Sequence, residues 1–285
     1  MQILDEMKPQ QSPELLKSLH ILTRDGKINQ DSRRKLKQVY HLYNFIEPIL
    51  EKINQENEHY SIVDHGCGKS YLGFILYDLF IKSTLGQVIG IETRSELVEK
   101  SKELAKKLKF ERMHFINTAI ANAENLVPND VDMVTALHAC DTATDDAIFF
   151  GLKRQVKYFF LVPCCQAEVA KLMRKNKSSS LTKPIAELWR HPIHTREVGS
   201  HLTNVLRCLL LESQGYKLTV TELVGWEHSM KNELIIAEYV GVKKGNARER
   251  SLEILKLFNL QELESKFIIQ IFSLIWLWIK FSNIK

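Results

Sequence analysis

From Tyr60 onward the chain alternates short runs of β-type residues with amphipathic segments, and this alternation restricts the folds available to it. The pattern is typical of a parallel sheet with helices packed on its faces. Helical periodicity is clearest over residues 95–108 and 145–154, which lie between predicted strands. Seven strands are expected, at residues 60–64, 87–92, 113–118, 131–137, 157–163, 217–225 and 232–241.

The last two predicted strands are joined by a very short segment, residues 226–231. A crossover between parallel strands needs about a dozen residues or more, so these two strands are expected to pair antiparallel. The predicted fold class is therefore α/β, with a Rossmann-like seven-stranded sheet whose last strand is antiparallel.

The residues before Tyr60 are predicted to form an N-terminal helical extension of this sheet. Ser12 is suited to cap a helix that has Pro13 in its first turn. A second helix is expected from near Ser32 to Ile53, where apolar residues recur with helical spacing. The segment around its start is basic, and we interpret it either as a solvated helix face or as a contact for nucleic acid. Its basic residues are Arg24, Lys27, Arg33, Arg34, Lys35 and Lys37.

The chain has 285 residues, which suits one α/β domain with helical additions. We place a helical region at 1–59, the sheet domain at 60–242 and a helical tail at 243–285. The net charge of +5 mildly favours a polyanionic partner. The five cysteines follow no disulfide spacing and no secretory signal is recognisable, so a cytoplasmic location is expected. The apolar stretch 267–281 is shorter than the roughly 20 residues that a membrane span needs, so we expect it to contact the core, a partner or a second copy.

The most informative motif is the loop that follows the first predicted strand, residues 64–70, with the sequence Asp-His-Gly-Cys-Gly-Lys-Ser. A phosphate-binding P-loop would need an earlier glycine where Val63 stands. A dinucleotide site would need a third glycine where Tyr71 stands, which disfavours NAD. S-adenosylmethionine has no pyrophosphate and tolerates a larger residue there, so it is the favoured cofactor.

Several residues at the predicted strand ends have the chemistry that this cofactor requires. Gly66 and Gly68 let the backbone turn sharply beside its methionyl end. Asp64 can accept a hydrogen bond from its ammonium group, and Glu92 can accept hydrogen bonds from both ribose hydroxyls. A glycine loop followed by an acid at the end of the next strand, in a seven-stranded sheet, is typical of class I methyltransferases. The predicted adenine contacts are Thr118 and Ile120.

Polar clusters follow three other strands, at the edge of the sheet where open α/β proteins bind ligands. They are residues 138–141 (His-Ala-Cys-Asp), 163–166 (Pro-Cys-Cys-Gln) and 227–232 (Glu-His-Ser-Met-Lys-Asn). Three clusters on one rim favour a functional pocket. Taken alone, each cluster has a simpler interpretation: a helix cap at His138, buried thiols at Cys164 and Cys165, and an exposed turn pair at Glu227 and His228. Adjacent cysteines fit tetrahedral zinc badly, so no metal site is predicted.

With these residues assembled, the sequence resembles the methyltransferase family that groups uncharacterised bacterial proteins with relatives of the tRNA acceptor-stem 2′-O-methyltransferases. The resemblance covers about residues 30–242 and is carried by VDHGCGKSYLGFILY (63–77), VDMVTALHACDTATDDAI (131–148), LVPCCQAE (161–168) and the segment 202–232. It implies that Asp64, Gly66, Gly68 and Glu92 bind the cofactor, and it places His138 on the reaction side, where His138 is also expected to contact the cofactor. It also implies that the reaction side is lined by Asp141, Cys164, Cys165, Glu227, His228, Lys231 and Asn232.

Two departures from this family pattern stand out. Ser229-Met230 replaces a usual Thr-Pro pair, and Asn204 stands where relatives often carry an aspartate. If that aspartate served catalysis or substrate binding, the activity of this chain would be altered.

Methyl transfer from a sulfonium is an in-line displacement, in which the enzyme positions a nucleophile and removes one proton. For a ribose hydroxyl, His228 or Asp141 would take the proton and Lys231 would stabilise the developing alkoxide. Attack by Cys164 or Cys165 on a pyrimidine ring is a second chemistry. We predict methylation of an RNA oxygen, in tRNA or rRNA. Methylation of a small molecule or protein, and a non-catalytic role in binding S-adenosylmethionine or RNA, stay open.

Overall fold

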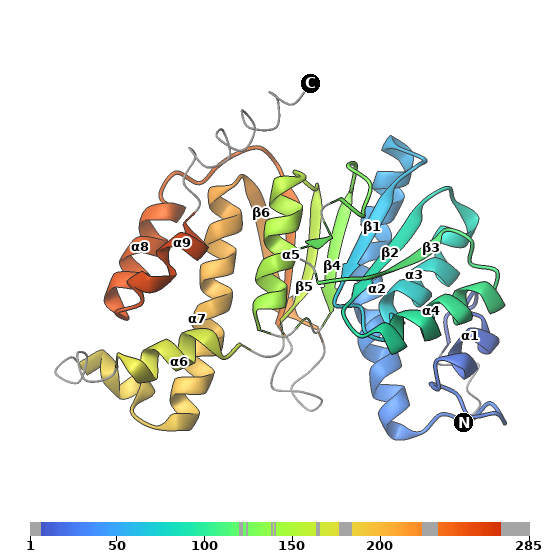
Figure 1. The fold of residues 1–285 in the computed structure, drawn as a ribbon, viewed down its shortest axis with the longest axis horizontal. Helices are drawn as coiled ribbons and strands as arrows, with labels where there is room; N and C mark the ends of the chain where they lie inside the picture. The colour runs from blue at the N-terminus through green and yellow to red at the C-terminus, as the bar shows by residue number, and fades with distance from the viewer. Residues whose placement is uncertain are drawn as a thin grey trace. The chain divides into compact units, whose positions relative to one another are not determined.

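The structure, a computed structural model, describes residues 7–119, 122–123, 125–137, 139, 141–163, 166–176, 184–223 and 233–268. It divides into two compact units (Figure 1). The first unit comprises Met1–Cys164 with Val220–Ile236, and the second comprises Cys165–Thr219 with Ala237–Lys285. The predicted parts 1–59, 60–242 and 243–285 remain a prediction about functional regions, since the units group residues by contact alone.

In the described part of the chain, seven strands form one mixed sheet in the order β3-β2-β1-β4-β5-β7-β6. The pairs from β3 through β5 are parallel. Strands β6 and β7 are consecutive and adjacent, as an antiparallel hairpin requires, and the predicted α/β fold class is confirmed. The strands are β1 (Ser61–His65), β2 (Gln87–Glu92), β3 (Met113–Asn117), β4 (Met133–Leu137), β5 (Tyr158–Val162), β6 (Tyr216–Glu222) and β7 (Glu233–Tyr239).

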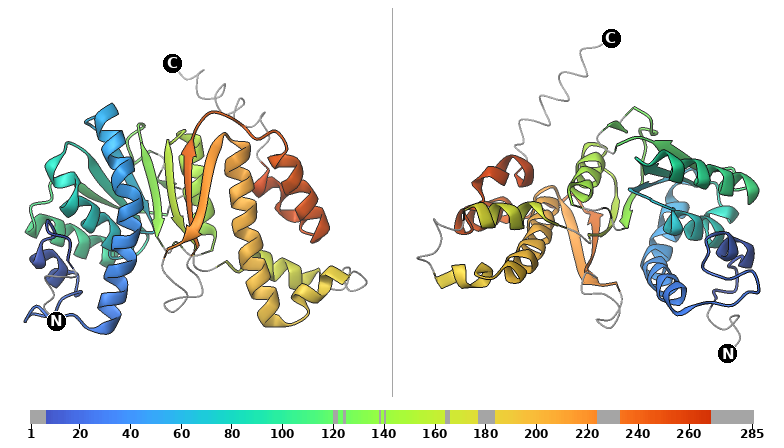
Figure 2. Two further views of the ribbon diagram at one scale, coloured as in Figure 1. Left: turned by 180° about the vertical axis from the view of Figure 1, so that it is seen from behind. Right: turned by 60° about the horizontal axis from the view of Figure 1, so that its bottom comes forward.

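Helices of the first unit cover both faces of its strands. Helix α2 (Gln30–Glu56) lies across one face and α5 (Thr142–Lys153) across the other, as Figures 1 and 2 show. The α2 side holds one large apolar cluster, to which α3 (Tyr71–Leu79) and α4 (Ser95–Lys107) contribute. Strand residues alternate in this cluster: Ile62 and Val88 belong to it, whereas Val63 and Ile89 are buried outside it. This alternation follows from the two-residue period of a strand, and it explains why the strands are apolar on both faces.

Both predicted N-terminal helices are present. Ser12 caps α1 (Pro13–Ser18), since its side chain accepts a hydrogen bond from the Leu15 amide at 3.3 Å. Helix α2 begins two residues before the predicted Ser32, because Asn29 accepts the Ser32 amide at 2.8 Å and acts as its cap.

The chain before α1 is fastened to α3 by the buried carboxylate of Asp78. Its Oδ2 accepts the backbone N–H of Ser12 at 2.7 Å and the side-chain amide of Gln11, which is also buried. Lys82 Nζ lies 3.8 Å from the other oxygen.

Replacing Asp78 by alanine is expected to lower the free energy of unfolding by about 2 kcal/mol, because two part-buried donors lose their acceptor. Urea unfolding with an unchanged m-value would measure this loss. Asp31→Ala is the matched control, since Asp31 is 85% exposed and its ion pair with Arg34 spans 3.7 Å. Equal midpoints for the two variants would contradict the anchoring role of Asp78.

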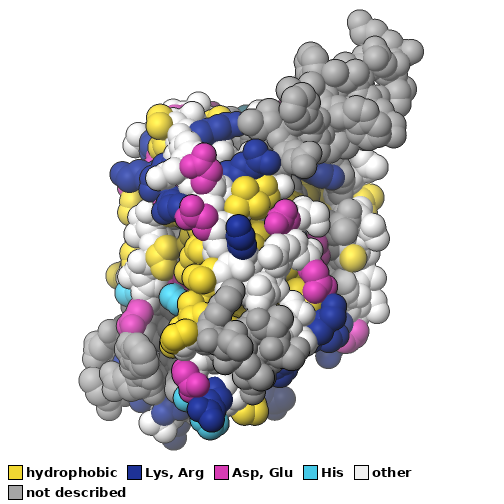
Figure 3. Space-filling view, turned by 90° about the vertical axis from the view of Figure 1, so that its left-hand side faces the viewer, with side chains coloured by type: hydrophobic (Ala, Val, Ile, Leu, Met, Phe, Trp, Pro, Cys, Tyr) yellow, Lys and Arg dark blue, Asp and Glu magenta, His cyan; other side chains and the backbone are white. Residues whose placement is uncertain are grey.

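The second unit is helical apart from its strand segments and has its own apolar cluster around Trp189. Helices α6 and α7 pack closely at Gly199, which has no side chain to separate them from Ala170. Figure 3 faces the left side of Figure 1 and shows hydrophobic side chains at the surface, interspersed with charged ones. The elements are α6 (Glu168–Lys175), η5 (Pro184–Trp189), α7 (Pro192–Ser213), α8 (Ala247–Leu257), η6 (Gln261–Leu263) and α9 (Glu264–Phe267).

The start of the predicted apolar tail lies in this cluster, since Phe267 and Ile268 are buried there. The rest of the stretch 267–281 lies outside the described residues. Within the described ranges, no helix has both the length and the apolar character needed to cross a bilayer.

Candidate functional site

The loop between β1 and α3, residues 66–70, makes a tight turn at the carboxyl end of β1. Gly66 and Gly68 have φ angles of +61° and +58°, a region that glycine adopts without the penalty paid by other residues. The amide of Cys67 donates to the carbonyl of Ile91 at 3.1 Å, which fixes the loop to the end of β2. A side chain at Gly66 would lie 3.5 Å from Cβ of Ala139, so Ala139 borders the same loop. The sharp turn predicted for the two glycines is therefore present.

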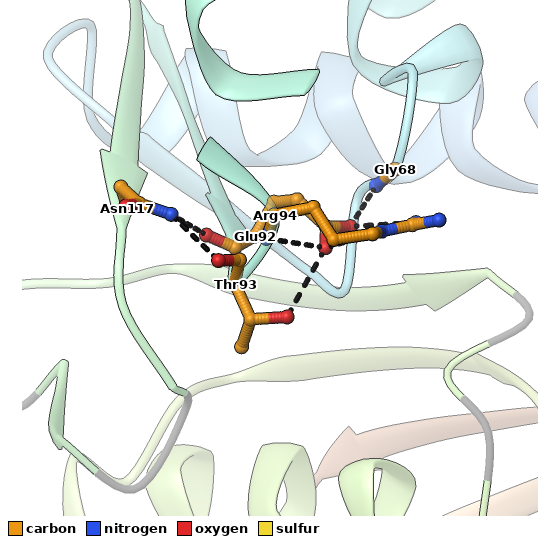
Figure 4. A network of polar contacts seen from close by, with 5 residues as sticks. All are labelled: Gly68, Glu92, Thr93, Arg94 and Asn117. Atoms are coloured by element: carbon orange, nitrogen blue, oxygen red, sulfur yellow. Dashed lines mark hydrogen bonds and ion pairs between the residues drawn. The ribbon is translucent and has the colours of Figure 1, made fainter. Parts of the chain in front are cut away.

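The carboxylate of Glu92 joins the end of β2 to this loop (Figure 4). Its Oε2 accepts the amide of Gly68 at 2.9 Å. Arg94 donates to the same carboxylate three times: its amide and Nε reach Oε1 at 3.1 and 3.0 Å, and its Nη2 reaches Oε2 at 3.2 Å. Asn117 at the end of β3 closes the group, because its side-chain amide donates to the carbonyls of Glu92 and Thr93 at 3.0 and 2.9 Å. We call Gly68, Glu92 and Arg94 the Glu92 clasp.

Glu92 is held as an anion. Burial raises the pKa of its carboxyl, but the hydrogen bonds from Arg94 and Gly68 outweigh burial, and the pKa is lower than usual. An anionic carboxylate at the end of β2 can accept hydrogen bonds from a pair of hydroxyls. Arg94, whose side chain is 60% exposed, would have to share or yield the carboxylate to such a diol. Arg94 was not predicted; the only signal was a basic residue two positions after the acid.

Asp64 has the opposite electrostatic character. Its carboxyl is buried at the register position beside Thr135, whose hydroxyl donates to Oδ1 at 2.8 Å. Burial raises the pKa of Asp64 to about 7, and the Thr135 hydrogen bond opposes that rise only in part. A cation placed beside Asp64 would favour its carboxylate form.

The residue after Asp64 is a histidine, His65, which is fully buried at the end of β1. Neither ring nitrogen of His65 has a hydrogen-bond partner among the described residues. The ring lies edge-on to that of Phe150, with 4.5 Å between the ring centroids. Burial, aided by the positive charge of Arg154, lowers the pKa of His65 to about 3. The imidazole is therefore neutral and packs as an apolar ring.

The structure brings six of the predicted site residues to one edge of the first unit. Thr118 follows β3 and donates its amide to the carbonyl of Glu92 at 3.2 Å. Asp141 stands at the N-terminus of α5 with a φ of +51°, two residues after Ala139, which borders Gly66. With Asp64, Gly66, Gly68 and Glu92, these residues surround the carboxyl ends of β1 through β4. The remaining predicted residues lie outside the described ranges: Ile120, His138, Cys164, Cys165, Glu227, His228, Lys231 and Asn232.

Asn204, the departure noted in the sequence, belongs to a buried network in the second unit. Its Oδ1 accepts Nε2 of Gln166 at 2.7 Å and Nη1 of Arg207 at 3.2 Å. Oε1 of Gln166 accepts a hydrogen bond from the hydroxyl of Ser200 at 2.8 Å. Asn204 thereby fixes the residue that directly follows the Cys164-Cys165 pair in the sequence.

Comparison with known families agrees with the chemistry of these strand ends. Residues 34–172 match a methyltransferase domain. The matched methyltransferase domain contains β1 through β5, the glycine loop and the whole Glu92 clasp. No curated protein sequence matches the chain.

Three solved structures illustrate what the chain resembles. A methyltransferase of Podospora anserina with bound SAH is 11% identical, over 80% of this chain and 88% of that chain, with a TM-score of 0.49. The magnesium protoporphyrin IX methyltransferase of Synechocystis PCC 6803 with bound SAH is 12% identical over 79% and 94%, with a TM-score of 0.44. An rRNA methylase of Streptococcus thermophilus is 12% identical over 64% and 87%, with a TM-score of 0.41.

Proposed function

We propose that the chain is an S-adenosylmethionine-dependent methyltransferase that methylates an oxygen of RNA, in tRNA or rRNA. The Glu92 clasp is the observation that carries the proposal, because it pairs an anionic carboxylate with a glycine turn at the ends of two adjacent strands. The match of residues 34–172 to a methyltransferase domain supports the reaction class. The basic N-terminal segment and the net charge of +5 support a polyanionic substrate.

The carboxylates and glycines of the site fit this cofactor. Glu92 would accept hydrogen bonds from both ribose hydroxyls, and Asp64 would accept one from the ammonium group. The buried carboxyl of Asp64, with its pKa of about 7, would ionise when this cation binds. Gly66 and Gly68 leave the backbone open to close approach, and Thr118 borders the adenine position. When bound, the cofactor supplies an electrophilic methyl group on a sulfonium.

The chain's own part in the reaction is to position the acceptor hydroxyl and to remove its proton. We assign the base to His228 or Asp141 and stabilisation of the oxyanion to Lys231, with Cys164 and Cys165 lining the same side. We expect the enzyme in the cytoplasm, where thiols such as Cys67 and Cys208 stay reduced.

The first test is calorimetric titration with S-adenosylmethionine, with NADH as the control ligand. At pH 6 the ammonium of the ligand would drive ionisation of the mostly neutral Asp64, so wild-type protein should release close to one proton more per site than Asp64→Asn. Comparing buffers of different ionisation enthalpy measures this difference, which should shrink as the pH rises through about 7. Absence of S-adenosylmethionine binding, or equal proton release by both proteins, would count against the proposed site.

A positive titration should be followed by incubation with methyl-labelled cofactor and total cellular RNA. Label in RNA that disappears after treatment with ribonuclease would support an RNA acceptor. Label recovered only in protein or in small molecules would refute that part of the proposal.

A further inference from the structure

A cavity of about 440 Å³ lies between the C-terminal end of α1 and helix α4, both in the first unit. Figure 1 shows the two helices side by side, and the ion pair between Glu14 and Lys107 links them at 3.8 Å. The two buried residues of the lining are Leu19 and Ser101, and the partly buried Leu97 and Leu104 add apolar surface. We call this cavity the α1–α4 groove.

Exposed lysines border the groove. Lys69, Lys100 and Lys107 contribute three positive charges, against one carboxylate at Glu103. Neither Lys69 nor Lys100 has an ion-pair partner within the ranges that the structure describes. Lys107 donates a hydrogen bond from Nζ to Oγ of Ser18 at 3.3 Å and forms a 3.8 Å ion pair with the exposed Glu14. Lys69 and Lys100 are therefore available to an anionic ligand, and Lys107 would exchange its contact with the exposed Glu14 for a phosphate.

The groove adjoins the start of the basic segment found in the sequence. His20 lines the groove, and its carbonyl accepts the hydroxyl of Ser32 at 3.4 Å. This contact holds the start of α2 against the His20 turn. The exposed basic residues on either side of that contact are Arg24, Lys27, Arg34, Lys35 and Lys37, of which Arg34 pairs with Asp31.

The groove is elongated and leads to the cofactor loop. Its α4 residues recur with helical spacing from Leu97 to Lys107, which corresponds to about 15 Å along the helix axis. Lys69 also lines it and directly follows Gly68 of the Glu92 clasp. A linear anion bound along this lining would therefore run toward the loop that holds the cofactor in the proposed function.

We infer that the α1–α4 groove binds the sugar–phosphate backbone of a single-stranded RNA segment and guides it past the cofactor loop; the inference rests on the proposed function. The lysines contact phosphates, and Leu97 and Leu104 contact the sugars. Charge and shape carry the recognition, so binding is independent of base sequence and depends strongly on salt. A compact anion would fill only part of such a track, which favours a polymer.

The inference is tested with a fluorescein-labelled 20-nucleotide single-stranded RNA of mixed sequence and fluorescence anisotropy. The groove variant is Lys100→Ala with Lys107→Ala. The control is Lys102→Ala with Lys106→Ala, which removes the same charge from the same helix but lies outside the groove. The groove variant should bind about tenfold more weakly at physiological salt, and the slope of log affinity against log salt should shrink by about 1.4. The control should resemble wild type.

Equal losses in both variants, or no loss in either, would overturn the inference. The inference would also be overturned if polyglutamate, added at the same total negative charge, displaced the labelled RNA as effectively as unlabelled RNA. If the double variant unfolds because Lys107 contacts α1, Lys100→Ala alone should still reduce the slope by about 0.7. Titration of the same proteins with S-adenosylmethionine separates the two proposals. If the protein binds S-adenosylmethionine but the groove variant binds RNA as wild type does, only the groove inference is rejected. If RNA binding depends on the groove lysines but S-adenosylmethionine does not bind, the proposed function is rejected.

Discussion

Replacing Glu92 by alanine is expected to weaken S-adenosylmethionine binding about 100-fold, or about 3 kcal/mol. Two hydrogen bonds from ribose hydroxyls to a charged acceptor would be lost. The loop itself would also suffer, since the amide of Gly68 loses its acceptor at 2.9 Å and Arg94 loses its carboxylate partner. The effect should therefore exceed the loss of the ribose contacts taken alone.

Calorimetric titration measures this change, with Glu92→Gln as the intermediate variant, because an amide oxygen keeps one acceptor and no charge. Glu111→Ala is a suitable control, since Glu111 is exposed and lies in the turn before β3. Thermal unfolding of Glu92→Ala would show whether the variant remains folded. Wild-type affinity in a folded Glu92→Ala protein would place the cofactor somewhere else.

Replacing Gly199 by valine is expected to destabilise the second unit by about 3 kcal/mol. A Cβ at this position would lie 2.8 Å from the backbone nitrogen and Cα of Ala170, and backbone atoms cannot move aside as a flexible side chain can. Helix α6 would have to separate from α7, which opens the apolar cluster around Trp189. The two further carbons of valine enlarge the conflict.

Amide hydrogen exchange would show where the structure is destabilised and by how much. Protection should fall in α6 and α7 of Gly199→Val while β1 and β2 of the first unit stay protected. Gly245→Val provides the comparison, because nothing lies within 4 Å of a Cβ there and its stability should stay within about 0.5 kcal/mol of wild type. Uniform loss of protection across both units would mean that they unfold as one.

The sheet was the most predictable part of this protein. Strand β2 was predicted at its observed bounds, Gln87–Glu92, because a strand buried on both faces forms a continuous apolar run and this one ends at a charged residue. Boundaries set by side-chain hydrogen bonds were harder to predict. Strand β4 begins at Met133 and not at Val131, and Asp132 just before it accepts the amide of Ser61 at 2.9 Å.

The candidate site was predictable in its residue types but not in its electrostatics. Sequence pattern could assign Asp64 and Glu92 to the ends of neighbouring strands, since acids there are conspicuous among apolar residues. It could not indicate that Arg94 turns back onto Glu92, because that contact depends on the local backbone after β2. Nor could it indicate that α6, α7 and α8 gather around Trp189, because helical periodicity reveals an apolar face and not its partner.

The strand order also governs how the chain behaves while it is being synthesised. Strand β5 is buried at all five positions and lies between β4 and β7, yet β7 ends 77 residues after β5 does. At a synthesis rate of about 5–20 residues per second, the side of β5 that will pair with β7 stays unpaired for about 4–15 s. An apolar strand edge of this kind is a template for pairing with other chains. The nascent protein is therefore most prone to aggregation in this interval, when a chaperone would have its largest effect on yield.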